Sequence, residues 1–384
     1  MPHRILYVSA VGAIAGAERS LLELVRALDR SRFEPLAAVP EKGMLAAQLK
    51  ALDVDVFSIP ELRLHRTADP ALLASAASRC TSAAAIVAQE ARRRRVSLVH
   101  SNNTAAQFIG NAAGLMARIP VVWHVRDMRP LGALAPVLAR GAAGVIFISR
   151  AVQNAVPLPD APAVIHRVIH NGLDADAFER AARPGALRGE VGIAPETPVL
   201  LMAAQMVPWK GHRTFIEAVA RVRRHCPGIV ALVAGGDLFC EHAQYAAELN
   251  RLVSELGLAE AVRFLGYRED MPTLMADCDV LVVPSEGEPF GRVALEAMAL
   301  GRPVVGTRDG GLPEVVADGR TGMLVPPRDA EAMAAALCTL LDDASLRRAL
   351  GEGGRRRVRA EFSITDHVRQ VQEVYDAVLA GRTA

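Results

Sequence analysis

The sequence places two glutamates around the start of a predicted helix, a position at which proteins bind anionic ligands. The run 282–305 reads in order as an apolar β-branched strand, a turn-rich loop, a helix with one apolar face, and a second strand. The first turn of a helix has free backbone N–H groups and the positive end of the helix dipole, so it attracts a phosphate. Gly291 lets such a ligand approach the backbone closely. We therefore expect an anion site where the helix over 290–300 begins.

The two acids of this run, Glu288 in the loop and Glu296 in the helix, suggest that the ligand is more than a phosphate. A carboxylate beside a phosphate is electrostatically unfavourable unless it binds another group, and sugar hydroxyls are suitable donors for it. The alternative is that Glu296 is a solvated helix residue and Glu288 a turn residue. Spacing alone leaves both interpretations open.

Several motifs in and around this run resemble the donor-site signature of the retaining glycosyltransferases of family 4, also called group 1, which have the GT-B fold. These motifs are Glu288-Pro289-Phe290-Gly291 with Glu296, Gly301-Arg302-Pro303-Val304-Val305, Gly310-Gly311-Leu312-Pro313-Glu314 and the run 318–325. Further similar positions are Gly16-Ala17-Glu18, Ile148-Ser149, Asn171-Gly172-Leu173-Asp174 with Phe178, and Lys210-Gly211. The resemblance therefore covers almost the whole chain.

The resemblance implies an α/β protein with the GT-B architecture, in which two Rossmann-like doubly wound domains face a central cleft. We expect an N-terminal acceptor-binding domain over 1–182 and a C-terminal donor-binding domain over 183–361. A final helix, about 362–384, would pack back onto the N-terminal domain. The stretch 182–197, rich in proline, glycine and charged residues, reads as the linker.

The activity that the resemblance implies is transfer of a sugar from a nucleotide-diphospho-sugar to an acceptor with retention of anomeric configuration, in a hexosyltransferase-type reaction. Glu296 would bind the ribose hydroxyls and Glu288 the donor sugar. Lys210 would neutralise the leaving diphosphate, where negative charge develops, with help from the amides of Phe290 and Gly291. The candidate catalytic residues are His124, Glu288 and Lys210. The candidate donor-binding residues are Glu296, Phe290, Gly291, Gly16, Gln205, Arg292 and Gly287.

Two positions depart from the family pattern. Gln205 stands where the family often has an arginine that pairs with the lysine on the donor diphosphate, and Ala15 stands where the first of two glycines is common. Loss of the arginine weakens charge neutralisation. Either Lys210 and the helix N-terminus suffice in this chain, or another arginine substitutes.

Predicted strands and helices alternate along the chain, as the βα units of a parallel sheet do. The expected strands are 5–8, 35–39, 54–59, 97–100, 121–124, 144–148 and 164–169, then 199–202, 229–234, 262–266, 280–283 and 303–305. Ligands of such sheets bind at the carboxyl ends of the strands. His124, with Arg126 and Asp127, follows one of these strands. A lone histidine there is more often structural, but the resemblance places His124 at the sugar end of the cleft.

The composition excludes several classes of protein. A chain of 384 residues suggests two domains, and a net charge of +2 implies no nucleic-acid partner. Five cysteines without paired spacing form neither a disulfide framework nor a zinc site, which fits the cytoplasm. Three Asp-x-Asp triplets occur, at 53–55, 174–176 and 277–279, but none lies near the phosphate helix in sequence. We expect no metal and no cofactor apart from the nucleotide-sugar substrate.

Contact with a membrane is left open by the sequence. We find no run of about 18 apolar residues and so expect no spanning helix. Residues 3–17 resemble a signal peptide, but a first strand and its following helix explain them better. The acceptor implied by the resemblance is a cell-envelope glycan or lipid-linked saccharide. The run Arg92 to Arg95 either attaches the protein peripherally to the anionic inner face of the cytoplasmic membrane or solvates a helix end.

Two other functions are considered. A nicotinamide-dependent oxidoreductase would carry G-x-G-x-x-G after its first strand, and Gly12 to Gly16 give only a partial match. A non-catalytic binding subunit on the same fold is favoured only by Gln205. Turnover of a donor separates the enzyme from this second alternative.

Overall fold

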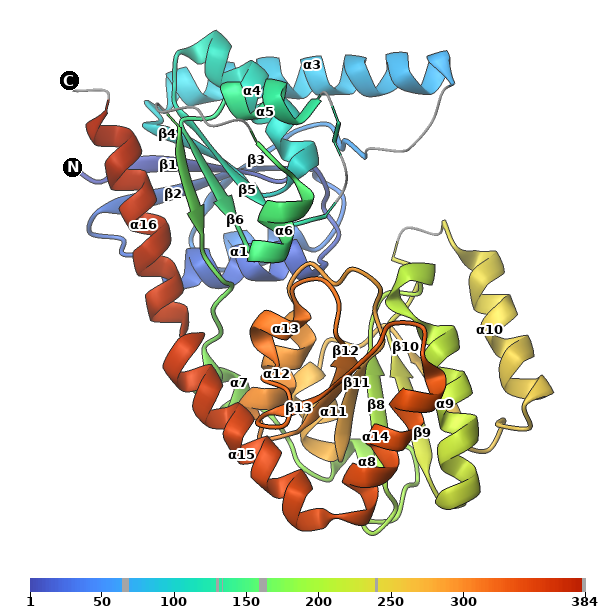
Figure 1. Cartoon of the computed structure of the whole chain (residues 1–384). Coiled ribbons are helices and arrows are strands. Elements are labelled where there is room, and N and C mark those ends of the chain that lie inside the picture. The colour runs from blue at the N-terminus through green and yellow to red at the C-terminus, as the bar shows by residue number, and fades with distance from the viewer. Residues whose placement is uncertain (64–68, 129–130, 133, 159–163, 239–240, 382–384) are drawn as a thin grey trace. The chain divides into compact units, whose positions relative to one another are not determined.

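The structure, a computed structural model, describes residues 1–63, 69–128, 131–132, 134–158, 164–238 and 241–381. The chain forms two compact units (Figure 1): Met1–Gly172 with Ile364–Ala384 make the first, and Leu173–Ser363 make the second. The sequence analysis placed the first boundary near residue 182 and the return of the chain near 362. The chain leaves the first unit earlier, between Gly172 and Leu173, and re-enters it at Ile364.

The first unit is built on a sheet of seven parallel strands in the order β3-β2-β1-β4-β5-β6-β7. The strands are β1 (His3–Val8), β2 (Phe33–Val39), β3 (Asp55–Ser58), β4 (Leu98–Ser101), β5 (Val121–Val125), β6 (Gly144–Phe147) and β7 (Ile165–Val168). In β1, Ile5 and Tyr7 belong to one layer of the core, whereas Leu6 and Val8 belong to the other. Both faces of the sheet are therefore covered, which explains its nearly continuous apolar strands.

Helices supply the two outer layers of this unit. They are α1 (Gly16–Arg26), α2 (Leu45–Lys50), α3 (Pro70–Arg93), α4 (Thr104–Ala117), α5 (Leu134–Arg140), α6 (Arg150–Ala155) and α16 (Ile364–Ala380). The apolar faces of α1, α2 and α16 share one core layer, and those of α3 and α4 share the other. The last helix of the chain, α16, contributes Val371, Tyr375 and Val378 to the first of these layers.

The second unit repeats this architecture with six parallel strands in the order β10-β9-β8-β11-β12-β13. The strands are β8 (Val199–Ala203), β9 (Val230–Ala234), β10 (Val262–Gly266), β11 (Val280–Val283), β12 (Val304–Thr307) and β13 (Gly322–Val325). The helices are α7 (Ala175–Ala181), α8 (Ala186–Glu190), the 3-10 turn η1 (Pro208–Lys210), α9 (His212–His225), α10 (Ala243–Glu255), α11 (Met271–Asp277), α12 (Arg292–Ala299), α13 (Leu312–Val315), α14 (Ala330–Asp342) and α15 (Ala344–Glu361). The prediction of an α/β protein with doubly wound parallel sheets is confirmed.

The stretch 182–197, predicted as a linker, belongs instead to the second unit and contains α8. One buried carboxylate holds it there. Asp277 accepts hydrogen bonds from the backbone N–H groups of Gly185 (2.5 Å), Leu187 (2.9 Å) and Arg188 (3.1 Å). The partners are about ninety positions apart in the chain, so local sequence patterns gave no sign of this contact.

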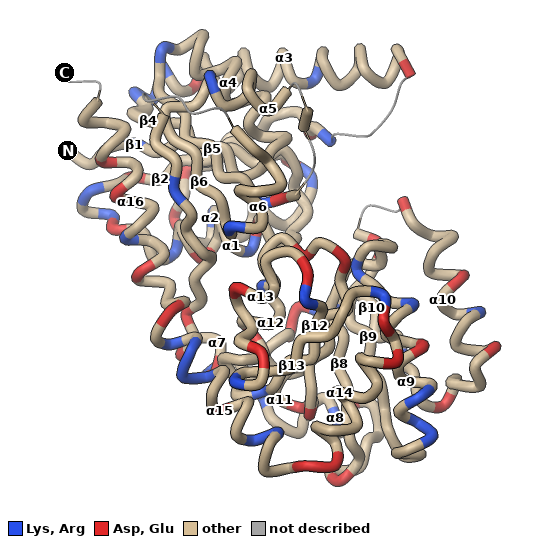
Figure 2. Tube along the Cα trace, viewed as in Figure 1, with Lys and Arg blue, Asp and Glu red and all other residues tan. Residues whose placement is uncertain are grey.

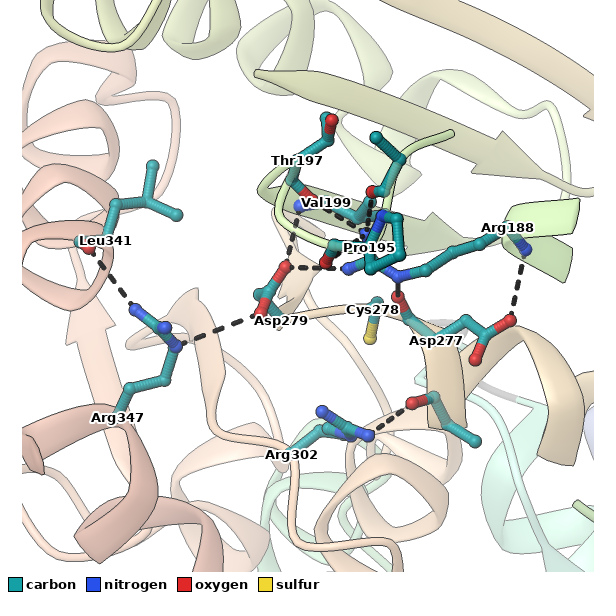
Figure 3. Close-up of polar contacts among 12 residues, drawn as sticks. Arg188, Pro195, Thr197, Val199, Asp277, Cys278, Asp279, Arg302, Leu341 and Arg347 are labelled. Carbon is teal, nitrogen blue, oxygen red and sulfur yellow. Dashed lines mark hydrogen bonds and ion pairs between the residues drawn. The ribbon is translucent and has the colours of Figure 1, made fainter. Parts of the chain in front are cut away.

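Arg188 completes the attachment (Figure 3). Its guanidinium donates to the backbone carbonyls of Pro195 and Thr197 and to the carboxylate of Asp279, which also accepts from the N–H of Val199. Asp277 and Asp279 form one of the three Asp-x-Asp triplets. Their oxygens bind the stretch 185–199 at the start of β11, the end opposite to its carboxyl edge.

Helix α3 bears on the expectation that the chain has no membrane-spanning helix. Among the described residues it is the one helix that is long and apolar enough to cross a membrane, by length and composition alone. Core helices of soluble proteins pass the same test, and Ala83 to Ala91 of α3 pack into the core against α4. Counting only uninterrupted apolar runs overlooked α3 because serines, a threonine and Arg79 divide the alanine-rich sequence of its first two thirds.

We predict that Asp277→Ala loosens the second unit. Three backbone N–H groups would lose their acceptor in a buried place, which we expect to lower the free energy of unfolding by about 3 kcal/mol. Equilibrium urea unfolding measures the loss, and hydrogen exchange of 185–199 locates it. The control is Asp342→Ala, an exposed partner of His225, with an expected change of about 0.5 kcal/mol or less. Equal unfolding curves for the two variants would contradict the assigned role of Asp277.

Candidate active site

The predicted anion site forms where β11 gives way to α12. The helix begins at Arg292, two residues later than predicted, after Gly291 adopts φ = 97° as the N-cap. A Cβ at Gly291 would lie 2.6 Å from Leu312 Cδ1, so both the backbone angle and the close packing favour glycine. Phe290 is buried and its ring lies 6.1 Å from that of Phe362, centroid to centroid. The close packing of Gly291 against Leu312 and of Phe290 against Phe362 thus fixes the start of α12.

Two candidate residues that are distant in sequence, Lys210 and Glu288, meet at this place. The Nζ of Lys210 lies 2.8 Å from Oε2 of Glu288, and the ammonium also lies 4.1 Å from the centroid of the Trp209 ring. The loops that carry them follow neighbouring strands, β8 and β11. These loops also touch through their backbones, since the N–H of Glu286 donates to the carbonyl of Trp209 at 2.7 Å. Glu288 is only 7% exposed, so its charge is balanced by Lys210 rather than by solvent.

A second pair, Arg292 and Glu296, lies on α12 itself. The Nε of Arg292 is 2.8 Å from Oε1 of Glu296, and the two side chains are 10% and 3% exposed. Residues four apart lie on the same face of a helix, and this face begins at the free N–H groups of the first turn. The two carboxylates and two cations at the start of α12 therefore form two buried ion pairs without net charge.

A residue that the sequence analysis missed, Asp309, supports the loop. Its carboxylate accepts hydrogen bonds from the N–H groups of Gly287 and Gly310, each at 2.8 Å. A Cβ at Gly310 would lie 2.3 Å from the carbonyl oxygen of Glu288, and the N–H of Gly311 donates to that same oxygen at 2.7 Å. An aspartate directly before Gly310-Gly311 was the available signal. Gln205 lies just beyond β8, where its carbonyl accepts from the N–H of Val207.

The first unit has its own polar cluster at the carboxyl ends of β1, β4 and β5. Gly16 is the first residue of α1, and open space surrounds the position where its Cβ would be. Ala15 has φ = −110°, which any residue adopts, so the missing glycine causes no strain there. Glu18 is buried and accepts from the N–H of Ala15 at 3.2 Å and from Ser9 Oγ at 3.4 Å. Burial raises the pKa of Glu18, against the opposing effect of these hydrogen bonds.

His124 lies within this cluster and is completely buried. The guanidinium of Arg126 lies 3.2 Å from His124 Nδ1 and donates to the side-chain oxygens of Asn102 (3.0 Å) and Asn171 (2.8 Å). An arginine can only donate, so Nδ1 of His124 is the acceptor and the ring proton is on Nε2. Among the described residues, His124 Nε2 makes no hydrogen bond. Burial lowers the pKa of His124 well below its usual value, and the charge of Arg126 lowers it further.

Two more histidines lie beside His124 and were not anticipated. The ring of His100 lies 5.3 Å from that of His124, and its Nδ1 is 2.7 Å from the hydroxyl of Tyr375 on α16. The ring of His367, also on α16, lies 6.2 Å from His124. Burial lowers the pKa of His100 as well. Residues from β4, β5 and the distant helix α16 therefore build this cluster, which local sequence patterns do not indicate.

The other two Asp-x-Asp triplets also have structural surroundings. Asp174 is the N-cap of α7, where its carboxylate accepts from the N–H of Ala177 at 2.9 Å. Asp53 has φ = 55° in the turn before β3, and Asp55 pairs with Arg94. The donor-site residues of the second unit lie in none of the three triplets.

Comparison with known proteins identifies the family. The family model described as Glycosyltransferase Family 4 matches residues 14–177, and the model described as Glycosyl transferases group 1 matches residues 185–357. The D-inositol 3-phosphate glycosyltransferase of Saccharomonospora viridis is 31% identical over 93% of this chain and 80% of its own length. The chain belongs to the group 1, family 4 glycosyltransferases. This glycosyltransferase is also similar to a lipopolysaccharide core biosynthesis glycosyltransferase of Rhizobium meliloti, with 36% identity over 47% of this chain and 51% of that protein.

Solved structures show the same fold. HepE from Anabaena, in complex with UDP-glucose, is 28% identical with a TM-score of 0.82, covering 97% of this glycosyltransferase and 99% of HepE. Sucrose-phosphate synthase from Thermosynechococcus elongatus, 23% identical with a TM-score of 0.78, matches in fold over 99% of this chain and 100% of that chain. The prediction of a GT-B glycosyltransferase is confirmed.

The buried histidines predict how stability depends on pH. Because the pKa values of His100 and His124 are lowered on folding, the unfolded chain binds more protons below about pH 6.5, the ordinary pKa of histidine. The stability of the first unit is therefore fully present above that pH and falls as the pH drops below it. We expect His124→Asn to reduce the fall in the thermal midpoint between pH 7.5 and 5.5.

The exposed His225→Asn variant of the second unit provides the control and keeps the wild-type pH dependence. Calorimetry at several pH values resolves the transitions. An unchanged pH dependence in His124→Asn would mean that His124 takes up no proton on unfolding.

Proposed function

We propose that this glycosyltransferase transfers a hexosyl group from a nucleotide-diphospho-sugar to an acceptor hydroxyl with retention of anomeric configuration. The observation that carries the proposal is the pair of buried ion pairs, Lys210–Glu288 and Arg292–Glu296, at the start of α12. A helix N-terminus with two adjacent cations suits a diphosphate, and two carboxylates suit hydroxyl groups. The complexes of HepE with UDP and with UDP-glucose support the same donor class.

Binding of the donor would exchange the partners of both pairs. The diphosphate takes Lys210 and Arg292, while the ribose hydroxyls take Glu296 and the sugar hydroxyls take Glu288. Each buried charge keeps an opposite charge or a hydrogen-bond donor throughout, so none is left uncompensated. Arg292 thereby supplies the second cation that Gln205 does not.

The chemical step leaves negative charge on the departing diphosphate. The bond between the anomeric carbon and the β-phosphate oxygen breaks, and the acceptor oxygen forms its bond on the same face of the sugar. The acceptor proton passes to the departing phosphate oxygen, so no separate protein base is needed. Lys210, Arg292 and the amides of the first turn of α12, including that of Gly291, stabilise the charge that develops. Gly287 and Phe290 fix the loop that carries Glu288.

In the first unit, Gly16 and His124 are the residues that we assign to the reaction. The open space at Gly16 leaves room for a ligand beside the start of α1. His124 is held neutral with its proton on Nε2, so it would donate a hydrogen bond to a sugar hydroxyl instead of acting as a base.

The acceptor that we propose is a cell-envelope glycan or lipid-linked saccharide, reached in the cytoplasm with peripheral contact to the anionic membrane surface. The run Arg92 to Arg95 is not by itself a free basic patch. Arg93 and Arg94 pair with Glu90, and Arg92 donates to the carbonyl of Met116. These arginines mainly pair with groups near the end of α3, so a membrane contact needs other residues as well.

A donor screen with the purified chain tests the function. We expect release of a nucleoside diphosphate from one donor sugar, and we expect this release to persist in excess EDTA because cations and helix amides replace a metal ion. A dependence on added Mg²⁺ or Mn²⁺ would contradict the metal-free mechanism. Nucleotide binding without turnover of any donor would favour the non-catalytic alternative.

The Lys210–Glu288 pair predicts a separation of activity from stability. We expect Lys210→Met to lower kcat by about 100-fold through loss of charge stabilisation, and also to lower stability because Glu288 stays buried without its partner. In the double variant with Glu288→Gln, stability should return while activity stays low. Full activity in Lys210→Met would show that another group neutralises the diphosphate.

The Arg292–Glu296 pair predicts a difference between ligands. We expect Arg292→Met to weaken binding of the nucleoside diphosphate about tenfold or more but to leave binding of the free nucleoside nearly unchanged. Glu296→Ala should weaken both, because both carry the ribose. Adding Gln205→Arg to Arg292→Met should restore part of the lost affinity. Calorimetry measures each constant, with the exposed Arg348→Gln as control; equal losses for both ligands in Arg292→Met would refute its role.

A further inference from the structure

Positive charge is unevenly distributed along the chain. Residues 70–158 contain ten arginines, no lysine and only two acids, Glu90 and Asp127, whereas the whole chain has a net charge of +2. This segment therefore carries a charge of +8 and the remainder is acidic. Such an asymmetry indicates a negatively charged partner for one side of the molecule. The segment includes helices α3, α4 and α5 of the first unit.

The first half of α3 has an unusual surface. From Pro70 to Ser78 it contains alanine, leucine and serine after the proline, without a charged residue, and nearly every side chain is exposed. Leu72 and Leu73 are 53% and 51% exposed. Figure 2 shows almost no charge along this half of the helix. An uncharged helical segment rich in alanine and leucine is more often covered by protein or lipid, whereas this half of α3 is exposed.

Helices α4 and α5 extend the same surface, which we call the α3–α5 face. Its exposed apolar side chains are Leu72, Leu73, Leu115, Met116, Leu134 and Val137. Its exposed basic side chains include Arg79, Arg92, Arg118 and Arg140. The helices form one layer, since α3 packs against α4 and the carbonyl of Leu138 on α5 accepts from Asn111 on α4 at 2.9 Å. Adjacent helices of this layer thus carry both exposed apolar and exposed basic side chains.

We propose that the α3–α5 face docks on the surface of an anionic lipid bilayer. This extends the peripheral membrane contact of the proposed function and gives it a location and a chemistry. Exposed leucines enter the boundary between headgroups and acyl chains, and arginines bind the lipid phosphates. The second half of α3 is packed in the protein core, so the helix lies on the bilayer instead of crossing it.

Other occupants fit the face less well. A second copy of the chain would bring two strongly basic surfaces together, and the repulsion would oppose a dimer. Single-stranded nucleic acid is held by aromatic side chains that stack on bases, and none of the exposed apolar residues of the face is aromatic. An acidic protein partner remains a result that the experiment distinguishes.

Flotation of the full-length protein with vesicles tests the proposal. We expect binding to vesicles of phosphatidylglycerol and phosphatidylcholine at low salt, weaker binding at high salt, and none to phosphatidylcholine alone. Leu72→Ser with Leu73→Ser should reduce the partition coefficient about tenfold. The triple variant Arg79→Gln, Arg118→Gln, Arg140→Gln should reduce it about 100-fold, at about fivefold for each arginine.

Matched controls come from the second unit. Leu256→Ser and the triple variant Arg221→Gln, Arg224→Gln, Arg348→Gln remove the same kinds of exposed side chain and should bind vesicles as wild type does. Circular dichroism and nucleotide affinity confirm that each variant is folded, and nucleotide affinity tests the donor site independently of the membrane. Absence of wild-type binding at low salt, or equal losses in the two sets of variants, overturns the proposal. Binding to an acidic polypeptide but to no vesicle would assign the face to a protein instead.

Discussion

A buried carboxylate is stable only when a cation or several hydrogen-bond donors lie against it, and this constraint organises the candidate donor site. Glu288 and Glu296 are almost entirely removed from solvent, and Lys210 and Arg292 compensate them. The pairing requires that the loops after β8 and β11 keep their positions relative to one another. The close contact of Gly310 with the carbonyl of Glu288 and the hydrogen bonds to the carboxylate of Asp309 hold the second loop in place. The site is therefore preorganised by charge balance before any ligand enters.

The first unit meets the same constraint in a different way. Arg126 is a buried cation, and neutral groups satisfy it: the amide oxygens of Asn102 and Asn171 and one nitrogen of His124. Burial, with a further contribution from the charge of Arg126, lowers the pKa values of His100 and His124. The second unit thus pairs its buried carboxylates with cations, whereas in the first unit the side-chain partners of Arg126 described above are neutral.

The sequence was sufficient to predict every strand except β13 and to place the start of α12 to within two residues, because those features follow from local apolar patterns and turn residues. It also placed Lys210 and Glu288 on loops at carboxyl ends of strands. That these two residues touch depends on β8 and β11 being neighbours in the sheet, which the order of elements along the chain does not specify. The same reason explains why α8 was mistaken for a linker: the acid that anchors it, Asp277, is far away in sequence. The histidine cluster was missed because its members come from β4, β5 and α16, each with an unremarkable local pattern.

Helix α16 has a consequence for how the protein is made. Its residues follow the whole of the second unit in the sequence, yet Val371, Tyr375 and Val378 are part of the core of the first unit. The second unit is continuous in sequence, so all of its residues are synthesised before α16 is. The core layer that α1 and α16 share stays incomplete, with the apolar side chains of α1 uncovered, until α16 has been synthesised. The unit that comes first in the sequence is therefore the one whose core is completed second.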